Sequence, residues 1–354
     1  MQLQLGAVSG RMPAVDLRLD RSLSTQPASF QLYVRCNLYH NKSDNVKSKT
    51  QNGRMFILGM GFLGQFFAAD LKSKGWMVSG TCTSISKKKK LDEIGFDAYV
   101  FNANDPNLEV LDIIKYHTHL LVSVPPVLGV GDPMLQHKEL LRSRLKDSNL
   151  QWLSYLSSTS VYGDTGGAWV HEDYPIGTSS QLGRARLAAE EGWLGLGRDL
   201  NIAVQIFRLG GIYGPGRSAI DTVVKQEAPS MKQRLRSSKR YTARIHVADI
   251  CQALNASIQK PSSGRIYNIV DDDPAPRAEV FRFAQNLVKK KWPGHGQQCF
   301  ASETAGSPVS EGDQRKEKRV SNTRMKEELG VQLLYSTYQS GLLDIIEHID
   351  NPFV

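Results

Sequence analysis

Three glycines at the end of a short apolar run have a spacing that suits phosphate binding. Gly59, Gly61 and Gly64 follow the apolar residues 56–58 in a G-x-G-x-x-G pattern. The first glycine of such a pattern permits a tight turn out of a strand, the second lets backbone approach a pyrophosphate, and the third lets the next helix pack closely on the sheet. The pattern predicts a bound dinucleotide, and the alternative is a structural turn in an empty α/β domain.

The residues on both sides of the glycines are those of a β-α-β unit. The apolar pattern predicts an amphipathic helix over 62–74 and a second strand over 76–83, with Gly75 between them. The helix would begin at Phe62 and Leu63, and its first amides and the positive end of its dipole would face the phosphates. We therefore expect both residues to bind the cofactor together with the three glycines.

The end of the second strand indicates which dinucleotide is preferred. Folds specific for NAD usually place Asp or Glu about 20 residues after the glycines, where it binds the ribose 2′-hydroxyl. Residues 80–84 contain no acid, and four lysines follow at 87–90. Thr83 and Lys87 are candidates for contact with a 2′-phosphate, which favours NADP over NAD as the cofactor. The alternative is that at least two of the lysines only begin a solvated helix.

The next part of the chain continues the alternation of strands and helices. Apolar runs predict strands over 98–101, 120–124 and 152–156, with a helix over 134–147. This alternation is typical of a Rossmann fold, an α/β fold with a doubly wound parallel sheet. Residues that follow the carboxyl ends of such strands face the cofactor. The further candidates for cofactor contact are Asn102, Val124, Pro125 and Ser157.

Several longer motifs occur in the second half of the chain. They are SSTSVYG at 157–163, FRLGGIYGPG at 207–216, RIHVADI at 244–250 and YNI at 267–269. Together with the glycine pattern, these motifs resemble the short-chain dehydrogenase/reductase superfamily, in the extended form shared by nucleotide-sugar epimerases and dehydratases. The resemblance covers about residues 55–346. It implies an NAD(P)-binding Rossmann domain over 54–215 and a small C-terminal α/β substrate lobe over 216–354, interleaved with the last Rossmann elements.

The catalytic residues of this superfamily are only partly present. The resemblance places Ser158 at the position of its catalytic Ser or Thr. The superfamily's Tyr-x-x-x-Lys motif is absent, and alignment on LAAE at 187–190 puts Leu182 and Arg186 at its two key positions. Leucine cannot transfer a proton, and arginine can hold a ribose but cannot act as a base. The chain therefore resembles the atypical branch of the superfamily, with Ser158 and Arg186 as its catalytic candidates.

Two hypotheses for the function follow. The first is an NAD(P)-dependent oxidoreductase, epimerase or dehydratase that acts on a small substrate. Basic residues within 217–244 favour an anionic substrate, although a solvated loop would have the same composition. The second is a non-catalytic NADP-binding protein that senses redox state or supports assembly of a partner. The missing tyrosine favours the second hypothesis, and the substrate-lobe motifs favour the first.

The C-terminal part of the chain completes the predicted substrate lobe. Its apolar pattern predicts helices over 276–290, 322–329 and 338–349, with Asn322 as the N-cap of the second. The resemblance implies that His246 packs the two lobes together rather than acting in catalysis. It also makes a homodimer a possible assembly.

Composition and charge limit the remaining possibilities. Residues 1–53 carry seven Lys or Arg against three Asp, and the whole chain has a net charge of +9. This segment predicts a transit peptide for the chloroplast, with a mitochondrial leader or a disordered extension of a cytoplasmic protein as alternatives. No apolar run approaches the ~18 residues that span a bilayer. Scattered cysteines and the lack of a basic stripe with aromatics predict no metal site and no nucleic-acid binding.

Overall fold

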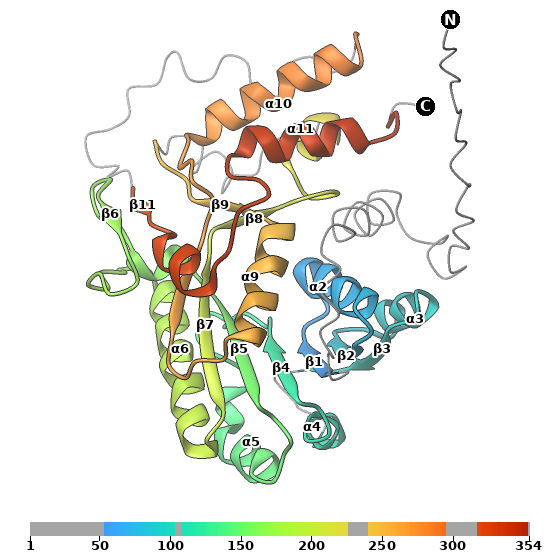
Figure 1. Ribbon diagram of the computed structural model, residues 1–354, viewed down its shortest axis with the longest axis vertical. Coiled ribbons are helices and arrows are strands. Elements are labelled where there is room, and N and C mark those ends of the chain that lie inside the picture. Colours follow the sequence, from blue (N-terminus) through green and yellow to red (C-terminus); the bar gives the residue numbers. More distant parts are fainter. Residues whose placement is uncertain (1–52, 103–107, 226–239, 295–316, 353–354) are drawn as a thin grey trace, which may run out of the picture.

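The computed structural model describes residues 53–102, 108–225, 240–294 and 317–352. Its centre is a seven-stranded parallel sheet in the order β10-β7-β5-β4-β1-β2-β3 (Figure 1). The order reverses between β1 and β4, which is where doubly wound folds bind their ligands. The predicted Rossmann sheet is thus confirmed. Its strands are β1 (Arg54–Leu58), β2 (Met77–Cys82), β3 (Asp97–Val100), β4 (His119–Val122), β5 (Trp152–Ser158), β7 (Ala203–Leu209) and β10 (Ile266–Ile269).

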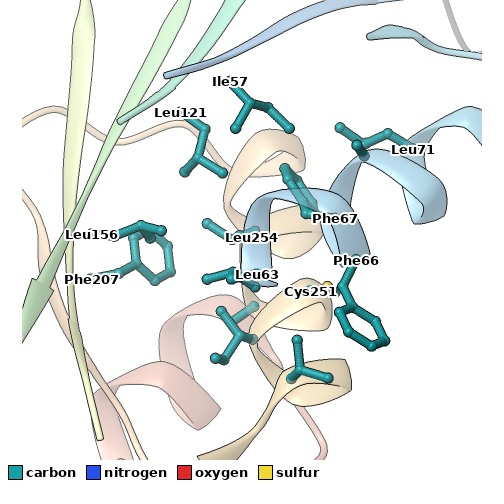
Figure 2. Close-up of a cluster of buried hydrophobic side chains, with 14 of the residues drawn as sticks. Ile57, Leu63, Phe66, Phe67, Leu71, Leu121, Leu156, Phe207, Cys251 and Leu254 are labelled. Atoms are coloured by element: carbon teal, nitrogen blue, oxygen red, sulfur yellow. The ribbon is translucent and has the colours of Figure 1, made fainter. Parts of the chain in front are cut away.

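Helices cover both faces of this sheet, which explains why its central strands are continuous apolar runs. β4 is buried along its whole length, and β1 is buried after its first residue. Figure 2 shows the core on one face, where Phe67 of the first helix and Leu254 of α9 lie against Ile57 and Leu121 of the sheet. The helices of this face are α2 (Phe62–Ser73), α3 (Ile85–Glu93) and α9 (Val247–Gln259). Those of the other face are α4 (Leu108–Ile114), α5 (Lys138–Leu145) and α6 (Gln181–Leu200).

A second, smaller group of elements lies beyond the carboxyl ends of the strands (Figure 1). Strand β8 (Gly211–Tyr213) pairs in parallel with β9 (Arg244–His246). Three helices share an apolar core beside this pair, formed by residues such as Ile220, Phe281 and Leu342. They are α7 (Ala219–Lys225), α10 (Arg277–Lys291) and α11 (Tyr338–His348). A further short pair joins β6 (Trp169–Val170) to β11 (Arg319–Val320).

Two predicted helices differ from their sequence-based form. The helix expected over 134–147 begins with a 3₁₀ turn, Leu135–His137, before α5, because the Asp132 carboxylate accepts hydrogen bonds from the amides of Met134 and Leu135. The helix expected over 322–329 contains a π-helical turn, Met325–Leu329.

Asn322, expected to cap the second of these helices, has another role. Its side-chain amide donates instead to the Val270 carbonyl, at 2.9 Å, and to the Asp272 carboxylate, at 2.8 Å. Asn322 therefore lies at the predicted N-cap position, where its carbonyl accepts the Lys326 amide at 3.2 Å, but its side chain ties this segment to the end of β10 instead of capping the helix.

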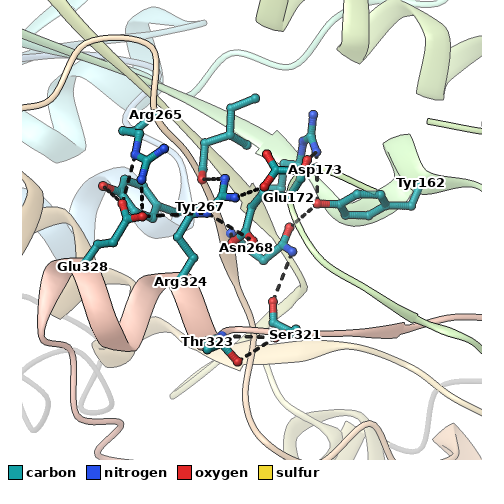
Figure 3. Close-up of polar contacts among 12 residues, drawn as sticks. Tyr162, Glu172, Asp173, Arg265, Tyr267, Asn268, Ser321, Thr323, Arg324 and Glu328 are labelled. Carbon is teal, nitrogen blue, oxygen red and sulfur yellow. Dashed lines mark hydrogen bonds and ion pairs between the residues drawn. The ribbon is translucent and has the colours of Figure 1, made fainter. Parts of the chain in front are cut away.

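A buried polar network connects the sheet to the C-terminal segment. Arg208 on β7 forms a buried ion pair with Glu190 on α6, at 2.7 Å, and donates to the Tyr162 hydroxyl, at 3.0 Å. Figure 3 shows how the network continues from Tyr162 to Asn268 on β10 and then to Ser321. Because a buried charge is costly without its partner, this network fixes the relative positions of β7, α6 and β10.

None of the helices in the four described ranges is long and apolar enough to cross a bilayer. Within the same ranges, no cluster of three or more His, Cys, Asp or Glu side chains is arranged to hold a metal ion. Apart from Gly53, the predicted leader 1–53 lies outside the described residues.

Candidate functional site

The glycine turn lies between β1 and α2, at the point where the strand order reverses. Gly59 has a φ of +100°, which strongly favours glycine, and its amide donates to the Thr81 hydroxyl at 2.9 Å. A β-carbon on Gly64 would lie 2.6 Å from the Gly59 carbonyl oxygen, so the helix packs too closely for any larger residue. A β-carbon on Gly61 would meet no atom within 4 Å. The open side of the turn is therefore at Gly61, where a pyrophosphate would approach.

The amides at the start of α2 are directed out of the helix. Gly61 is its N-cap, and the first intrahelical bond runs from the Gln65 amide to the Gly61 carbonyl, at 3.0 Å. The amides of residues 62–64 precede that bond, so they are the donors that a helix leaves open for an anion. The first turn of α2 carries no acidic residue to compete with a phosphate. These features fit the pyrophosphate of a dinucleotide.

Neighbouring strand ends bring further predicted residues to the same edge. Val124 and Pro125 follow β4, and the Val124 side chain would lie 3.4 Å from a β-carbon on Gly59. Asn102 follows β3 and is exposed. The loop after β4 therefore touches the glycine turn, as expected for a cofactor that lies across the switch point.

The end of β2 brings a hydroxyl group and an ammonium group together. The Lys87 ammonium lies 3.4 Å from the Thr83 hydroxyl, and both residues are exposed. Ser84 caps α3 by accepting the amide of Lys87. Lys88 has a different role, because it forms an ion pair with Asp92 and donates to the Ala98 carbonyl. Of these two lysines, only Lys87 is left facing the strand end.

Ser157 and Ser158 point to opposite faces of β5. The Ser157 hydroxyl is buried and donates to the Glu190 carboxylate, so its side chain belongs to the core rather than to the cofactor site. Its assignment as a cofactor-binding side chain therefore does not agree with the structure, because side chains alternate along a strand. The Ser158 hydroxyl accepts the Ser160 amide at 3.2 Å and lines a cavity.

Leu182 and Arg186 lie on the first two turns of α6, on the same helix face. Leu182 is 42% exposed, and Arg186 is partly buried. Neither residue lines the cavity that contains Ser158. Arg186 is close enough to Tyr155 to oppose the rise in its pKa that burial causes. The Tyr155 hydroxyl has no hydrogen-bond partner among the described residues, and sequence patterns gave no signal for its position beside Arg186.

The cavity beside Ser158 has a volume of about 630 Å³. It is bounded by the end of β5, by β8 and α7, and by α10 and α11 of the smaller lobe. Three tyrosines line it, none of which the sequence singled out: Tyr213, Tyr241 and Tyr338. Burial raises the pKa of the Tyr213 phenol, so this group stays protonated at neutral pH. Tyr162 is held elsewhere by Asn268 and Arg208.

The cavity wall is predominantly cationic. Among the described residues of the lining, the basic ones are Arg217, Lys225, Arg244, Arg277 and Lys318, and one is acidic, Asp221. Asp221 accepts hydrogen bonds from Ser218 at the start of α7, and burial raises its pKa. Other basic residues within 217–244, on which the expected anionic substrate also rested, lie outside the described residues: Lys232, Arg234, Arg236 and Lys239.

Arg244 is the most buried of these cations. Its guanidinium donates to the carbonyls of Asp273, at 3.0 Å, and Ala275, at 2.6 Å, and to the Thr242 hydroxyl. It also lies over the ring of Tyr338, 5.3 Å from the centroid. The acceptors of these hydrogen bonds are neutral, but the carboxyl groups of Asp271 and Asp273 also lie close enough for Arg244 to oppose the rise in their pKa values that burial causes.

His246 lies behind the cavity wall and acts in packing. Its Nδ1 accepts the Ala248 amide at the start of α9, and its ring lies between those of Tyr213 and Tyr335. Burial lowers its pKa to about 3, so the ring stays neutral. This placement agrees with the packing role expected of it.

Comparisons with known proteins place the fold and the motifs in one family. Residues 135–270 match the model of the NAD dependent epimerase/dehydratase family. Protein YeeZ of Escherichia coli (strain K12) is 30% identical over 224 residues, which cover 61% of this chain and 77% of that protein. The chain belongs to the NAD dependent epimerase/dehydratase family.

Solved structures agree with this assignment. A functionally unknown conserved protein from Silicibacter pomeroyi is 31% identical, with a TM-score of 0.65 over 83% of this chain and 98% of that one. UDP-glucose 4-epimerase from Thermotoga maritima has a TM-score of 0.67 over 83% and 98% of the two chains. At 15% identity, that second likeness concerns the fold alone.

Gly61 and Gly64 differ in their surroundings, so substituting each of them tests whether the turn binds a dinucleotide. We expect Gly61→Ala to leave the melting temperature unchanged, because its β-carbon meets open space, but to weaken dinucleotide binding about tenfold or more by obstructing the pyrophosphate. Gly64→Ala should lower stability by about 1–3 kcal/mol, because its β-carbon clashes with the Gly59 carbonyl. Thermal unfolding and calorimetric titration with NADPH measure both effects. Equal dinucleotide affinity in wild type and Gly61→Ala would contradict the assignment.

Proposed function

We propose that the protein binds NADP(H) at the glycine turn and catalyses a redox or isomerisation reaction on a small anionic substrate in the adjoining cavity. The observation that carries this proposal is that a residue of the cavity wall, Arg217, contacts the first residue of α2. Ser158 begins the cavity at the end of β5, and Arg217, farther along its wall, lies over the ring of Phe62 at the start of α2. A substrate in the cavity would therefore lie beside a dinucleotide bound at the strand ends.

The preference for NADP rests on the end of β2. Residues 80–84 carry no carboxylate that could bind a ribose 2′-hydroxyl, whereas the Thr83 hydroxyl and the Lys87 ammonium lie 3.4 Å apart. A 2′-phosphate would gain charge-assisted hydrogen bonds from this pair. The bound nicotinamide would supply the hydride chemistry of the reaction, and the protein would supply binding, orientation and charge.

Ser158 and the basic wall would orient the substrate. The Ser158 hydroxyl can donate to a carbonyl or hydroxyl oxygen while it accepts the Ser160 amide. Arg244 and the other cations would hold the anionic part of the substrate. Arg186 is the candidate to hold the nicotinamide ribose, and it cannot act as a base. The proton must therefore come from another group of the cavity or from water.

A second candidate function is supported by α6. By the resemblance, Leu182 occupies the position where the superfamily carries its tyrosine. Its side chain is exposed and has no acid or base group. A non-catalytic NADP-binding protein, acting as a redox sensor or in assembly, would need no proton donor at this position. The two functions differ in whether any substrate is turned over.

Cofactor preference gives the first test of this proposal. We expect the full-length protein to bind NADPH at least tenfold more tightly than NADH, a difference of about 1.4 kcal/mol. Lys87→Gln should remove most of this preference, because it removes the ammonium beside Thr83. The control is Lys89→Gln, which removes the same charge from an exposed position on α3. Nicotinamide fluorescence follows both ligands, and equal affinities for NADPH and NADH in wild type would refute the preference.

Ser158 separates an enzyme from a binding protein. In a screen of anionic carbonyl compounds for NADPH oxidation, we expect turnover that Ser158→Ala lowers by about 10²–10³, since a donor aimed at the reacting oxygen is lost. NADPH affinity should not change. Ser143→Ala is the matched control, because this serine is exposed on α5 and does not line the cavity. NADPH binding without turnover of any compound would favour the second candidate function.

A further inference from the structure

Arg217 is held in place by a tight turn that packs against the start of α2. Gly214 and Arg217 exchange backbone hydrogen bonds, at 3.1 and 3.0 Å, around Pro215 and Gly216. Gly216 has a φ of +79°, which with proline before it is typical of a type II turn. A β-carbon on Gly214 would lie 2.6 Å from the Val247 side chain, so the turn is pressed onto the body of the protein.

The helix that follows fixes the other side of this turn. Ser218 donates to the Asp221 carboxylate through its backbone amide, at 2.7 Å, while the Asp221 amide donates back to the Ser218 hydroxyl, at 3.2 Å. This reciprocal capping box anchors α7 directly after Arg217. The backbone of Arg217 therefore has little freedom, although its side chain is exposed.

The side chain of Arg217 lies between the two proposed sites. Its guanidinium carbon is 5.3 Å from the centroid of the Phe62 ring, and Phe62 is the first residue of α2. Arg217 also lines the cavity. Unlike Arg244, whose guanidinium is bonded to carbonyls, the Arg217 guanidinium makes no hydrogen bond or ion pair with any residue in the described part of the chain.

We propose that Arg217 binds the pyrophosphate of the dinucleotide, an inference that rests on the proposed function. The glycine turn and the α2 amides offer neutral donors and the partial charge of a helix dipole, but no full positive charge. A diphosphate carries negative charge on both phosphoryl groups. A planar guanidinium with free donors can neutralise it through paired hydrogen bonds. The contact with the Phe62 ring keeps that guanidinium next to the first residue of α2.

A role in substrate binding alone is the competing explanation, because Arg217 lines the cavity. The two roles separate when no substrate is present. A residue that binds the pyrophosphate affects NADPH affinity in the absence of substrate, whereas a residue that binds only the substrate does not. A ligand fragment that lacks the pyrophosphate, adenosine 2′-phosphate, reports whether the adenosine site stays intact.

The experiment measures calorimetric affinities of the full-length protein without substrate. We expect Arg217→Gln to weaken NADPH binding about 10- to 100-fold, as for the loss of charged hydrogen bonds, and to leave the affinity for adenosine 2′-phosphate unchanged. Arg217→Lys should restore part of the affinity, because it keeps a point charge but loses the paired geometry. Arg282→Gln removes the same charge from an exposed position of α10 and is the control. NADPH affinity should also depend less on salt in Arg217→Gln than in wild type.

The affinities distinguish a failure of the inference about Arg217 from a failure of the proposed function. If wild type binds NADPH and Arg217→Gln binds it equally well, the inference about Arg217 is overturned while the proposed function stands. Equal losses for NADPH and adenosine 2′-phosphate in Arg217→Gln would also overturn it, because the effect would then be general. If wild type binds neither NADPH nor NADH, the proposed function itself fails.

Discussion

The close contact between Gly64 and the Gly59 carbonyl is the constraint on which the site depends. A β-carbon at Gly64 would come within 2.6 Å of that oxygen, so α2 can approach the sheet only with glycine there. This approach places the α2 amides at the sheet edge between β1 and β4. It also places Phe62 where the turn of residues 214–217 packs against it. The dinucleotide site and the cavity wall are thus positioned by the same contact.

The smaller lobe adds charge to a fold that supplies mainly neutral donors. The α2 amides act through partial charges, whereas Arg217, in the turn before α7, and Arg244, on β9, bring full charges. The buried pair of Arg208 and Glu190, with Tyr162 and Asn268, keeps β7 and β10 in register beneath these elements. Binding and catalysis are separate questions here, because neither Leu182 nor Arg186 of α6 lines the cavity beside Ser158.

Local patterns predicted the sheet and the glycine turn because both depend on residues close in sequence. β1 and β4 are buried on both faces, so their sequences are apolar runs. Gly59 is required by its positive φ, and Gly64 by its contact with the Gly59 carbonyl. The side-chain direction of Ser157 could also have been predicted, because side chains alternate along β5 and only one of two adjacent serines can face the site. The family assignment confirmed the resemblance that these motifs carried.

The cavity could not be predicted in the same way. Its wall joins segments near residues 158, 217, 244, 277 and 338, which only the tertiary fold brings together. Asn322 showed the same limit, because a long-range bond to Val270 replaced the local cap that its position suggested. The NADP preference, the transit peptide, the domain boundaries and the homodimer remain predictions.

Hydrogen–deuterium exchange of the full-length protein, with and without saturating NADPH, tests the central claim most directly. The account predicts slower exchange for amides of the glycine turn, residues 59–64, and for peptides that contain residues 214–217, because both face the same dinucleotide. Protection confined to other parts of the chain, or none in these segments although NADPH binds, would contradict a dinucleotide site built from the β1–α2 turn and completed by the smaller lobe.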